Sequence, residues 1–504
     1  MDDNNTGREP TLERVPSGIA GIDAILGGGF MKGGIYIVAG RPGAGKTIFG
    51  NQLCYAHAAA GGKALYVTLL AENHARMLMH MRTLSFYDAS VLPKALTYVS
   101  AFQTLADEGL KGLLNVLRRE VQARGSTLLI LDGLVTTAEH AESDTAFKTF
   151  IHELQTAAHL IDCTMFLLTS ATGGRAISPE ETMVDGLIEF GDRTKDGWRA
   201  ERWLEVKKFR GSGYMRGRHA YNIGDNGIEV FPRIEALCHR PADREVKDTP
   251  RLSTGMAHFD RLLHGGIPCG STTLLVGPPG IGKTTFGLHF LGECGKAEPG
   301  LLFSFNEPSQ RLLAKSDALS LDLRRLTEEG ALEILWQPAT EGVLDELGDR
   351  LLTAVRRRDV RRVFIDGLAG LQEATAEPER IRRFCTAFAN ELRGLGVTSL
   401  YSGETDDAVG GIPGAPPSAV SLRGASAMAE NVLLMRFVEL RSGLHRIISI
   451  LKMRDSDFDA SLHEFVIGSE GIVVDETPER AETMLTDLTG GPRRRRASMP
   501  SRGG

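Results

Sequence analysis

Short apolar runs alternate along the chain with longer segments in which apolar residues recur every three or four positions. In the first half the apolar runs are rich in Val, Ile and Leu, and they predict buried strands at 35–39, 64–69, 128–131 and 164–169. The longer segments predict helices at 46–60, 105–124 and 147–160. Buried strands that alternate with helices indicate an α/β fold, in which helices cover both faces of a mostly parallel sheet.

The whole pattern occurs twice. The stretch "VPSGIAGIDAILGGGFMKGGIYIVAGRPGAGKTIF" parallels "LSTGMAHFDRLLHGGIPCGSTTLLVGPPGIGKTTF". Three landmarks keep nearly one spacing: 237 residues separate Lys46 from Lys283, 234 separate Asp132 from Asp366, and 244 separate Arg210 from Arg454. Near the end of each half, "RWLEVKKF" and "HRIISILKM" resemble hairpin strands. The sequence therefore predicts two tandem domains of about 230 residues, which is within the usual domain size.

Changes in composition suggest where these domains begin and end. We expect a polar N-terminal segment at 1–14, a first domain at 15–240, a linker at 241–250, a second domain at 251–474 and a tail at 475–504. The linker lies in "HRPADREVKDTP", which is polar and bounded by prolines. The tail ends in "GGPRRRRASMPSRGG", a polar and basic composition that predicts disorder.

Composition and charge exclude several classes of protein. A net charge of −6 and an aromatic content of 6%, with no basic stretch interleaved with aromatic residues, argue against a nucleic-acid partner. No apolar run approaches the roughly 18 residues that a membrane span needs, and the polar start "MDDNNTGREP" predicts no secretory signal. The six cysteines include no C-x-x-C pair, which argues against a zinc site or disulfides and favours a cytoplasmic location.

Each half carries a glycine-rich loop between a predicted strand and a predicted helix. "GRPGAGKT" and "GPPGIGKT" both satisfy G-x-x-x-x-G-K-[ST], the phosphate-binding P-loop. Its glycines let the backbone wrap around phosphates, its lysine pairs with the β- and γ-phosphates, and its threonine hydroxyl coordinates Mg²⁺. The predicted ATP-binding residues are Gly40, Gly43, Gly45, Lys46 and Thr47, and in the second half Gly277, Gly280, Gly282, Lys283, Thr284 and Thr285.

Two aspartates complete these predicted sites. Asp132 and Asp366 each end an apolar strand, in "TLLILDG" and "RVFIDG". P-loop ATPases place there the carboxylate that holds Mg²⁺ together with the loop threonine. The alternative is a solvated aspartate at a strand end, which explains one such residue better than two at matched positions.

A pair of cations recurs late in each half. Lys208 and Arg210 in "VKKFRGSGYMRG" are two residues apart, so on a strand both project from one face. Lys452 and Arg454 repeat the arrangement. Such a pair neutralises charge on a transferring γ-phosphate in the arginine-finger role, whereas the alternative is a solvated basic strand. Because each pair lies about 160 to 170 residues after its own P-loop lysine, we expect it to reach the nucleotide of a neighbouring subunit.

From Val15 to Val474 the chain resembles the KaiC family of circadian clock ATPases and autokinases. The resemblance rests on the doubled P-loop, on "KKFRGSGYMRG" with "IGDNGIEVFP", and on "LLMRFVELRSGLHRIISILKMRDS". It implies two RecA-like domains and a double-ring homohexamer with ATP between subunits. The first ring would hydrolyse ATP slowly, and the second would phosphorylate its own chain. By analogy the partners would include a KaiB-like protein and a histidine-kinase or response-regulator output partner.

The chain departs from the family at the catalytic Glu-Glu pair that follows the second strand of each domain. The first half reads "YVTLLAEN", with Leu70 and Ala71 at the pair and Glu72 directly after it. An aliphatic side chain cannot orient water for attack, so either Glu72 takes this role or the first ring mainly binds ATP. The second half reads "LFSFNEPS", in which Asn306 and Glu307 replace the pair and only Glu307 can accept a proton.

The resemblance also predicts a phosphoacceptor. The family carries an adjacent serine and threonine before the strand that matches "NVLLMRFVE", and the equivalent positions here are Ser426 and Ala427. We predict Ser426 as the acceptor and Ser421 as a secondary hydroxyl; the alternative is that Ser426 is an ordinary loop serine.

Two other functions fit the same motifs. A recombinase- or helicase-type nucleic-acid motor shares the fold, although fold alone does not determine function. A nucleotide-held scaffold with little catalysis is suggested by Leu70, Ala71 and Asn306. Binding to single-stranded DNA would support the motor, and steady-state ATP turnover separates the scaffold from an enzyme.

Overall fold

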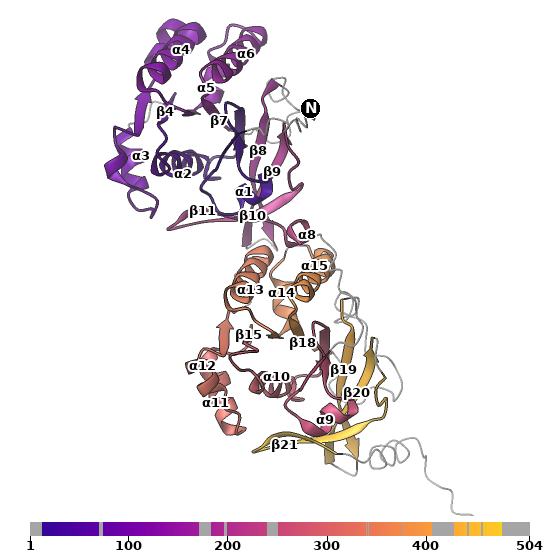
Figure 1. The fold of residues 1–504 in the computed structure, drawn as a ribbon. Helices are drawn as coiled ribbons and strands as arrows, with labels where there is room; N and C mark the ends of the chain where they lie inside the picture. Colours follow the sequence, from indigo (N-terminus) through magenta and orange to yellow (C-terminus); the bar gives the residue numbers. More distant parts are fainter. Residues whose placement is uncertain are drawn as a thin grey trace, which may run out of the picture. The chain divides into compact units, whose positions relative to one another are not determined.

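The structure is a computed structural model, and it divides into two compact units, Met1–Leu237 and Cys238–Gly504 (Figure 1). It describes residues 13–69, 74–170, 183–195, 199–238, 250–338, 340, 342–375, 377–405, 428–440, 443–454 and 457–475. Within these ranges no helix is long and apolar enough to cross a bilayer.

The first unit is built on a nine-stranded sheet in the order β11-β10-β9-β8-β3-β7-β6-β4-β5. The strands from β8 to β5 run parallel, and β9, β10 and β11 follow as antiparallel hairpins. Their bounds are β3 (Ile35–Gly40), β4 (Ala64–Thr68), β5 (Leu96–Ser100), β6 (Leu128–Asp132), β7 (Thr164–Ser170), β8 (Gly186–Lys195), β9 (Arg199–Phe209), β10 (Arg218–Gly224) and β11 (Gly227–Phe231).

Helices cover both faces of this sheet, as the alternating pattern predicts. Successive strand residues point to opposite faces, so Tyr36 and Val38 pack with Phe49 of α2, whereas Ile35 and Ile37 join the cluster under α4 and α6. The helices are α1 (Ile22–Leu26), α2 (Lys46–Ala59), α3 (His74–Met81), η1 (Ala89–Val91), α4 (Phe102–Arg124), α5 (Leu134–Glu139), α6 (Asp144–Leu160) and α8 (Ile234–Leu237).

The second unit repeats this topology strand for strand. Its sheet order is β16-β15-β17-β18-β14-β19-β20-β21-β22. These strands are equivalent to those of the first sheet, β5 through β11, when that order is read from its last strand to its first. The bounds are β14 (Thr272–Gly277), β15 (Gly300–Ser304), β16 (Leu332–Trp336), β17 (Arg362–Asp366), β18 (Thr398–Glu404), β19 (Asn431–Leu440), β20 (Gly443–Met453), β21 (His463–Gly468) and β22 (Gly471–Val474). The two units therefore confirm the predicted tandem α/β fold.

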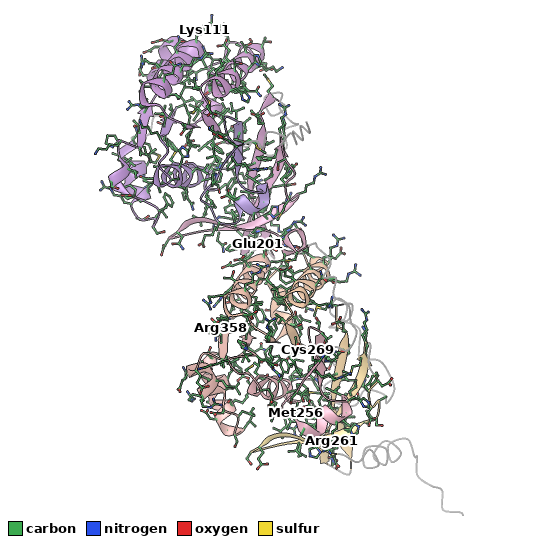
Figure 2. All side chains as sticks on the ribbon, viewed as in Figure 1. Lys111, Glu201, Met256, Arg261, Cys269 and Arg358 are labelled. Carbon is green, nitrogen blue, oxygen red and sulfur yellow. The ribbon has the colours of Figure 1, made fainter. Side chains whose placement is uncertain are left out.

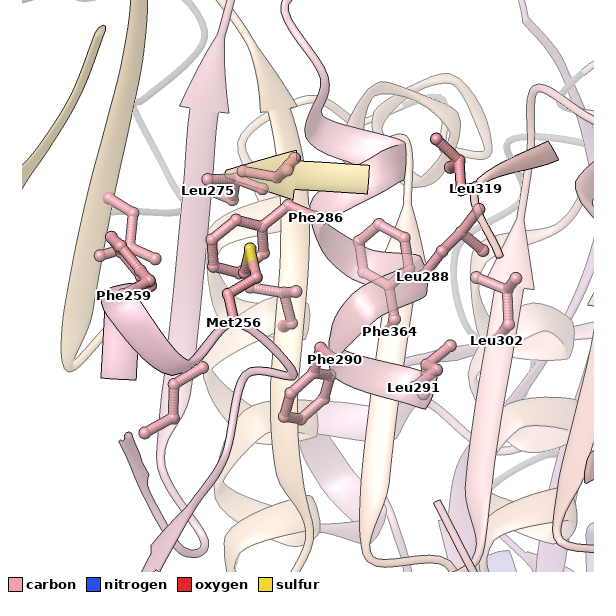
Figure 3. Close-up of a cluster of buried hydrophobic side chains, with 14 of the residues drawn as sticks. Met256, Phe259, Leu275, Phe286, Leu288, Phe290, Leu291, Leu302, Leu319 and Phe364 are labelled. Carbon is pink, nitrogen blue, oxygen red and sulfur yellow. The ribbon is translucent and has the colours of Figure 1, made fainter. Parts of the chain in front are cut away.

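The helices of the second unit enclose an apolar core beside α10. Figure 3 shows Phe286 and Phe290 of α10 with Phe259 and Phe364, all of them buried. The helices are α9 (Ala257–Leu262), α10 (Lys283–Gly292), α11 (Ser309–Ala318), α12 (Leu323–Glu328), α13 (Leu344–Arg358), α14 (Leu368–Glu373) and α15 (Arg380–Gly394).

Short strand pairs precede both large sheets, β1 (Arg14–Val15) with β2 (Phe30–Met31) and β12 (Arg251–Leu252) with β13 (Ile267–Pro268). In the second large sheet, the edge strand β16 carries Glu333, which pairs with Arg357 and Arg358 of α13. Arg358 is labelled in Figure 2. Charged pairs on an edge strand oppose its pairing with a strand from another chain.

His289 connects α10 to the hairpin strand β22. It is buried, and its Nε2 accepts a hydrogen bond of 3.0 Å from the backbone N–H of Ile472. Burial lowers the pKa of His289 below its ordinary value of 6.5. A histidine with a lowered pKa in the folded state stabilises the fold above the unfolded-state pKa, and this stability is lost as the pH falls through the folded-state value.

We therefore expect the second unit to lose stability between pH 7 and pH 5, with a slope of at most about 1.4 kcal/mol per pH unit from this group. Urea unfolding at pH 7, 6 and 5 measures the effect. His289→Gln keeps an acceptor but does not titrate, so its pH dependence should be flatter than that of the wild type. His258→Gln, a substitution of the same kind at an exposed position, is the control. A His289→Gln slope equal to that of the wild type would contradict the prediction.

Candidate active sites

The P-loop of the first unit lies between β3 and α2. Strand β3 ends at Gly40 and α2 begins at Lys46. Gly45, directly before the helix, has φ 92, and a Cβ there would lie 2.7 Å from Ile223, so only glycine fits. Lys46 Nζ lies over the loop and donates to the carbonyls of Gly40 and Arg41, at 2.7 and 3.0 Å.

The second P-loop has the same local structure. Gly282 has φ 120, and a Cβ there would lie 2.6 Å from Ile467. Lys283 Nζ donates to the carbonyls of Gly277 and Pro278, at 2.8 and 2.9 Å. Thr285, the additional residue predicted in this half, is buried in the first turn of α10. Burial lowers the pKa of both Lys46 and Lys283, and such a desolvated cation is attracted strongly to a phosphate.

The predicted metal residues are close together in both units. Thr47 Oγ1 donates to Asp132 Oδ2 at 3.2 Å, and Thr284 Oγ1 donates to Asp366 Oδ2 at 2.9 Å. Hydroxyl and carboxylate oxygens are the donors that Mg²⁺ prefers, and Mg²⁺ usually takes one or two carboxylates plus phosphate oxygens and waters. The described residues contain no cluster of three or more His, Cys, Asp or Glu able to hold a metal. The donors present therefore fit Mg²⁺ carried in with a nucleotide.

Each aspartate is held by a second hydroxyl from a neighbouring strand. Tyr66 of β4 donates to Asp132 Oδ2 at 2.8 Å, and Ser402 of β18 donates to Asp366 Oδ1 at 2.7 Å. Burial raises the pKa of the Asp366 carboxyl, and the hydrogen bonds from Ser402 and Thr284 partly offset this rise. These bonds fix the orientation of the carboxylate toward the P-loop threonine.

Asn306 and Glu307 lie beside Asp366 at the carboxyl edge of the second sheet. Strand β15 pairs with β17 so that Ser304 is opposite Asp366. A Cβ on Gly367 would lie 2.9 Å from Asn306 Nδ2, which shows how closely this amide packs on the residue after Asp366. The backbone N–H of Glu307 donates to Ser304 Oγ at 3.1 Å, and the Glu307 carboxylate pairs with Lys315 and Arg311.

The equivalent edge of the first unit carries a histidine. Leu70, Ala71 and Glu72 lie outside the described residues, so the proposed shift of Glu72 into the catalytic role stays a prediction. His74, at the start of α3, has its Nε2 2.9 Å from the hydroxyl of Thr68, which is opposite Asp132 in the sheet. Burial lowers the pKa of His74, which favours the neutral imidazole at pH 7.

The cationic pairs lie at the amino edge of each sheet, where the parallel strands begin, and this is opposite the carboxyl edge that carries the P-loop. Arg210 follows β9, and its N–H bonds to the carbonyl of Asp185, whose own N–H bonds to Ile35 at the start of β3. Arg454 is linked in the same way through Glu430 to Thr272 at the start of β14. Each arginine is therefore aligned with the beginning of the strand whose far end carries the P-loop.

In each unit, the lysine of the cationic pair lies beside a β-bulge, and the two bulges are at equivalent positions. Lys208 pairs with Leu187 across a β-bulge, and Lys452 pairs with Val432 across another. Lys208 and Lys452 are half-buried, whereas Arg210 and Arg454 are exposed beyond the strand ends. Bulges redirect side chains near functional sites, and the sequence pattern of a regular strand did not predict them.

The two predicted acceptors, Ser421 and Ser426, lie outside the described residues. The strand that follows them, β19, begins at Asn431, which pairs with Thr273 at the amino edge of β14. This is the sheet edge that also carries Arg454.

Comparison with known proteins agrees with this geometry. A family profile described as "ATPase: KaiC" matches residues 15–235 and, separately, residues 252–479. The chain belongs to this KaiC family. The circadian clock oscillator protein KaiC of Synechococcus elongatus is 23% identical over 501 residues, which cover 96% of this chain and 93% of that relative. The protein of the same name from Picosynechococcus sp. is 24% identical over 503 residues, with the same coverage. The relative named KaiC 1 from Synechocystis sp. is 24% identical over 480 residues, which cover 91% and 88%.

Sequence reasoning missed four side chains that this KaiC-family chain brings to its sites. Tyr66 and Ser402 reach the metal aspartates from neighbouring strands, and no local spacing connects them to those aspartates. His74 comes shortly after the residues that replace the Glu-Glu pair, and for that segment the sequence interpretation considered only carboxylates. Lys315 had a usable signal, because Glu307, Arg311 and Lys315 are spaced by four, the spacing of neighbours on a helix, although Glu307 itself precedes α11.

Proposed function

We propose that the protein is a KaiC-type ATPase and serine autokinase that works as a homohexamer, with Mg-ATP bound between subunits. The observation that carries this proposal is the position of the cationic pairs at the sheet edge opposite the P-loop in both units. A cation that serves phosphoryl transfer from there needs the nucleotide of another subunit.

The length of the strands supports this requirement. Arg454 is aligned with Thr272, five residues before Gly277, and five residues of strand span about 16 Å. Arg210 is aligned with Ile35, also five residues before the loop glycine Gly40. An arginine side chain is too short to cover this distance and bend around the sheet edge. The same mismatch in both units favours action between subunits.

The second site is proposed to transfer phosphate. Lys283 binds the β- and γ-phosphates, and Thr284 and Asp366 hold Mg²⁺. When bound, Mg²⁺ neutralises the charge that develops on the phosphate oxygens. Glu307 accepts the proton of the attacking hydroxyl, and Asn306 assists by hydrogen bonding at most. Arg454 and Lys452 of the neighbouring subunit stabilise the transferring phosphoryl group.

Ser426 is proposed as the main acceptor, with Ser421 as a secondary one. The strand that follows Ser426 begins at the amino edge of the sheet, where Arg454 also lies. The acceptor serine and the arginine would therefore serve the same neighbouring nucleotide. Ala427 has no hydroxyl, so one dominant phosphate is expected.

The first site is proposed to support assembly and slow hydrolysis. It has the same lysine, threonine and aspartate set as the second, in Lys46, Thr47 and Asp132, but Leu70 and Ala71 replace the glutamates. The relatives are named as circadian clock oscillator proteins. By analogy, a KaiB-like protein and a two-component output protein are the partners to test.

Steady-state ATP turnover tests whether the protein is an enzyme. We expect Mg-dependent phosphate release that does not respond to single-stranded DNA. Stimulation by DNA would favour the nucleic-acid motor, and binding of ATP without turnover would favour the scaffold.

We also expect ATP-dependent assembly. Light scattering should give the mass of a hexamer with Mg-ATP and a smaller species without nucleotide, because the interfaces are completed by nucleotide phosphates. Arg210→Ala should weaken assembly or hydrolysis in the first ring. A monomer at saturating Mg-ATP would contradict the proposed action between subunits.

A further inference from the structure

The Glu307 carboxylate is held in an unsymmetrical way. Its Oε1 receives Lys315 Nζ at 2.5 Å, whereas its Oε2 is buried and has no hydrogen-bond partner among the described residues. Arg311 Nε lies 3.3 Å from Oε2 without hydrogen-bond geometry, and the Arg311 side chain is 75% exposed. One oxygen therefore accepts a short hydrogen bond, whereas the other accepts none and has only the ion pair with Arg311.

A buried carboxylate oxygen without a donor is costly and needs an explanation. A general base needs such an oxygen, because the lone pair that takes the proton must not be occupied by another donor. A base is also more effective when a third group fixes its orientation, as in triads of nucleophile, base and orienting residue. Lys315, which donates a hydrogen bond to Glu307 Oε1, is placed to act as that orienting group.

The charges around Asp366 support this arrangement. Glu307 raises the pKa of Asp366 and Lys315 lowers it, so both groups are close enough to act on the metal carboxylate. Lys315 thus offsets the repulsion between two carboxylates at one sheet edge. The Lys315 side chain is 35% exposed and that of Glu307 is 17% exposed, so the pair is less screened than a surface pair.

We propose that Lys315 is a positioning residue for phosphoryl transfer in the second unit: it holds Glu307 Oε1 so that Oε2 faces the attacking hydroxyl. This inference rests on the proposed function of Glu307 as the base. No bond to Lys315 forms or breaks; the proton passes from the hydroxyl to Glu307 Oε2 as the γ-phosphoryl group leaves ADP.

The test compares wild type with Lys315→Met, Lys315→Arg, Glu307→Gln and the double variant Glu307→Gln/Lys315→Met. The matched control is Arg311→Met, which removes a cation next to the same carboxylate. For each protein, kcat and KM for ATP are measured on phosphate incorporation into the chain, because hydrolysis in the first unit also contributes to total ATP turnover. Calorimetry with a non-hydrolysable ATP analogue gives the affinity, and thermal unfolding reports the fold.

Lys315→Met should lower the kcat of phosphate incorporation about 10- to 100-fold, because a misplacement of about 1 Å has effects of this size. The KM and the affinity for the analogue should stay within about twofold, because Lys315 acts through Glu307. Lys315→Arg should recover most of the rate. In the Glu307→Gln background, loss of Lys315 should have little further effect, because residues that act as one unit are not additive. Arg311→Met should behave like wild type.

The following results would overturn the inference. A raised KM with unchanged kcat would make Lys315 a phosphate contact, and an equal loss in Lys315→Arg or a lowered unfolding temperature would make it structural. A Lys315→Met variant with wild-type kcat, while Glu307→Gln is impaired, would refute the positioning role alone. If Glu307→Gln itself matches wild type, the proposed base is wrong as well, which distinguishes the two failures.

Discussion

The Arg454→Ala variant is expected to lose phosphate incorporation into its own chain by about 10³-fold, the lower end of the range for arginine fingers. Arg454 is exposed, and it lies at the sheet edge opposite its own P-loop. Its removal should therefore leave the fold and the affinity of its own subunit for ATP intact. The rate is measured by intact mass after incubation with Mg-ATP, with assembly checked by light scattering.

Arg210→Ala provides the matched control, because Arg210 has the same position in the first unit. In hexamers assembled beforehand, this variant should keep most of its phosphate incorporation and lose hydrolysis in the first ring. If both arginine variants behave like wild type, these residues are only solvated ends of strands, and the proposed action between subunits has no support.

Much of the fold could be predicted from the sequence because the local and global signals agree. The apolar run at the start of the first domain became β3, and the glycine that precedes Lys46 ends the loop where the helix was expected to begin. The repeat of 237 residues between the two lysines predicted the shared topology. The matched bulges beside Lys208 and Lys452 were not predicted, although the buried residues around each one, Val206 and Phe209 and then Ile450 and Met453, are three positions apart where a regular strand has two.

The candidate sites were predictable where one motif carries the chemistry. Each P-loop joins its lysine and threonine in one local segment, and its spacing determines their geometry. The contacts of Ser402 with Asp366 and of Tyr66 with Asp132 depend on which strands become neighbours in the sheet. A single sequence shows the order of strands along the chain but not their order in space, so these contacts required the structure.

The two P-loop lysines are expected to differ in their effect on phosphorylation. Lys283→Ala removes a buried cation from the second site and should lower phosphate on Ser426 by at least about 10²-fold, as the loss of one preorganised stabilising group does. Lys46→Ala changes the first site, which is proposed to support assembly of the ring. In hexamers assembled before the measurement, it should leave phosphorylation of Ser426 within a few fold of wild type.

The central claim is that two structurally matched nucleotide sites have different tasks, and mapping of phosphate by fragmentation mass spectrometry tests it most directly. Wild type, Lys283→Ala and Lys46→Ala are incubated with Mg-ATP as preassembled hexamers, and the occupancy of Ser426 is followed with time. The account predicts one dominant phosphate on Ser426 in wild type and Lys46→Ala and almost none in Lys283→Ala. Absence of phosphate from all three proteins with ATP hydrolysis intact, or equal phosphate in both lysine variants, would contradict it.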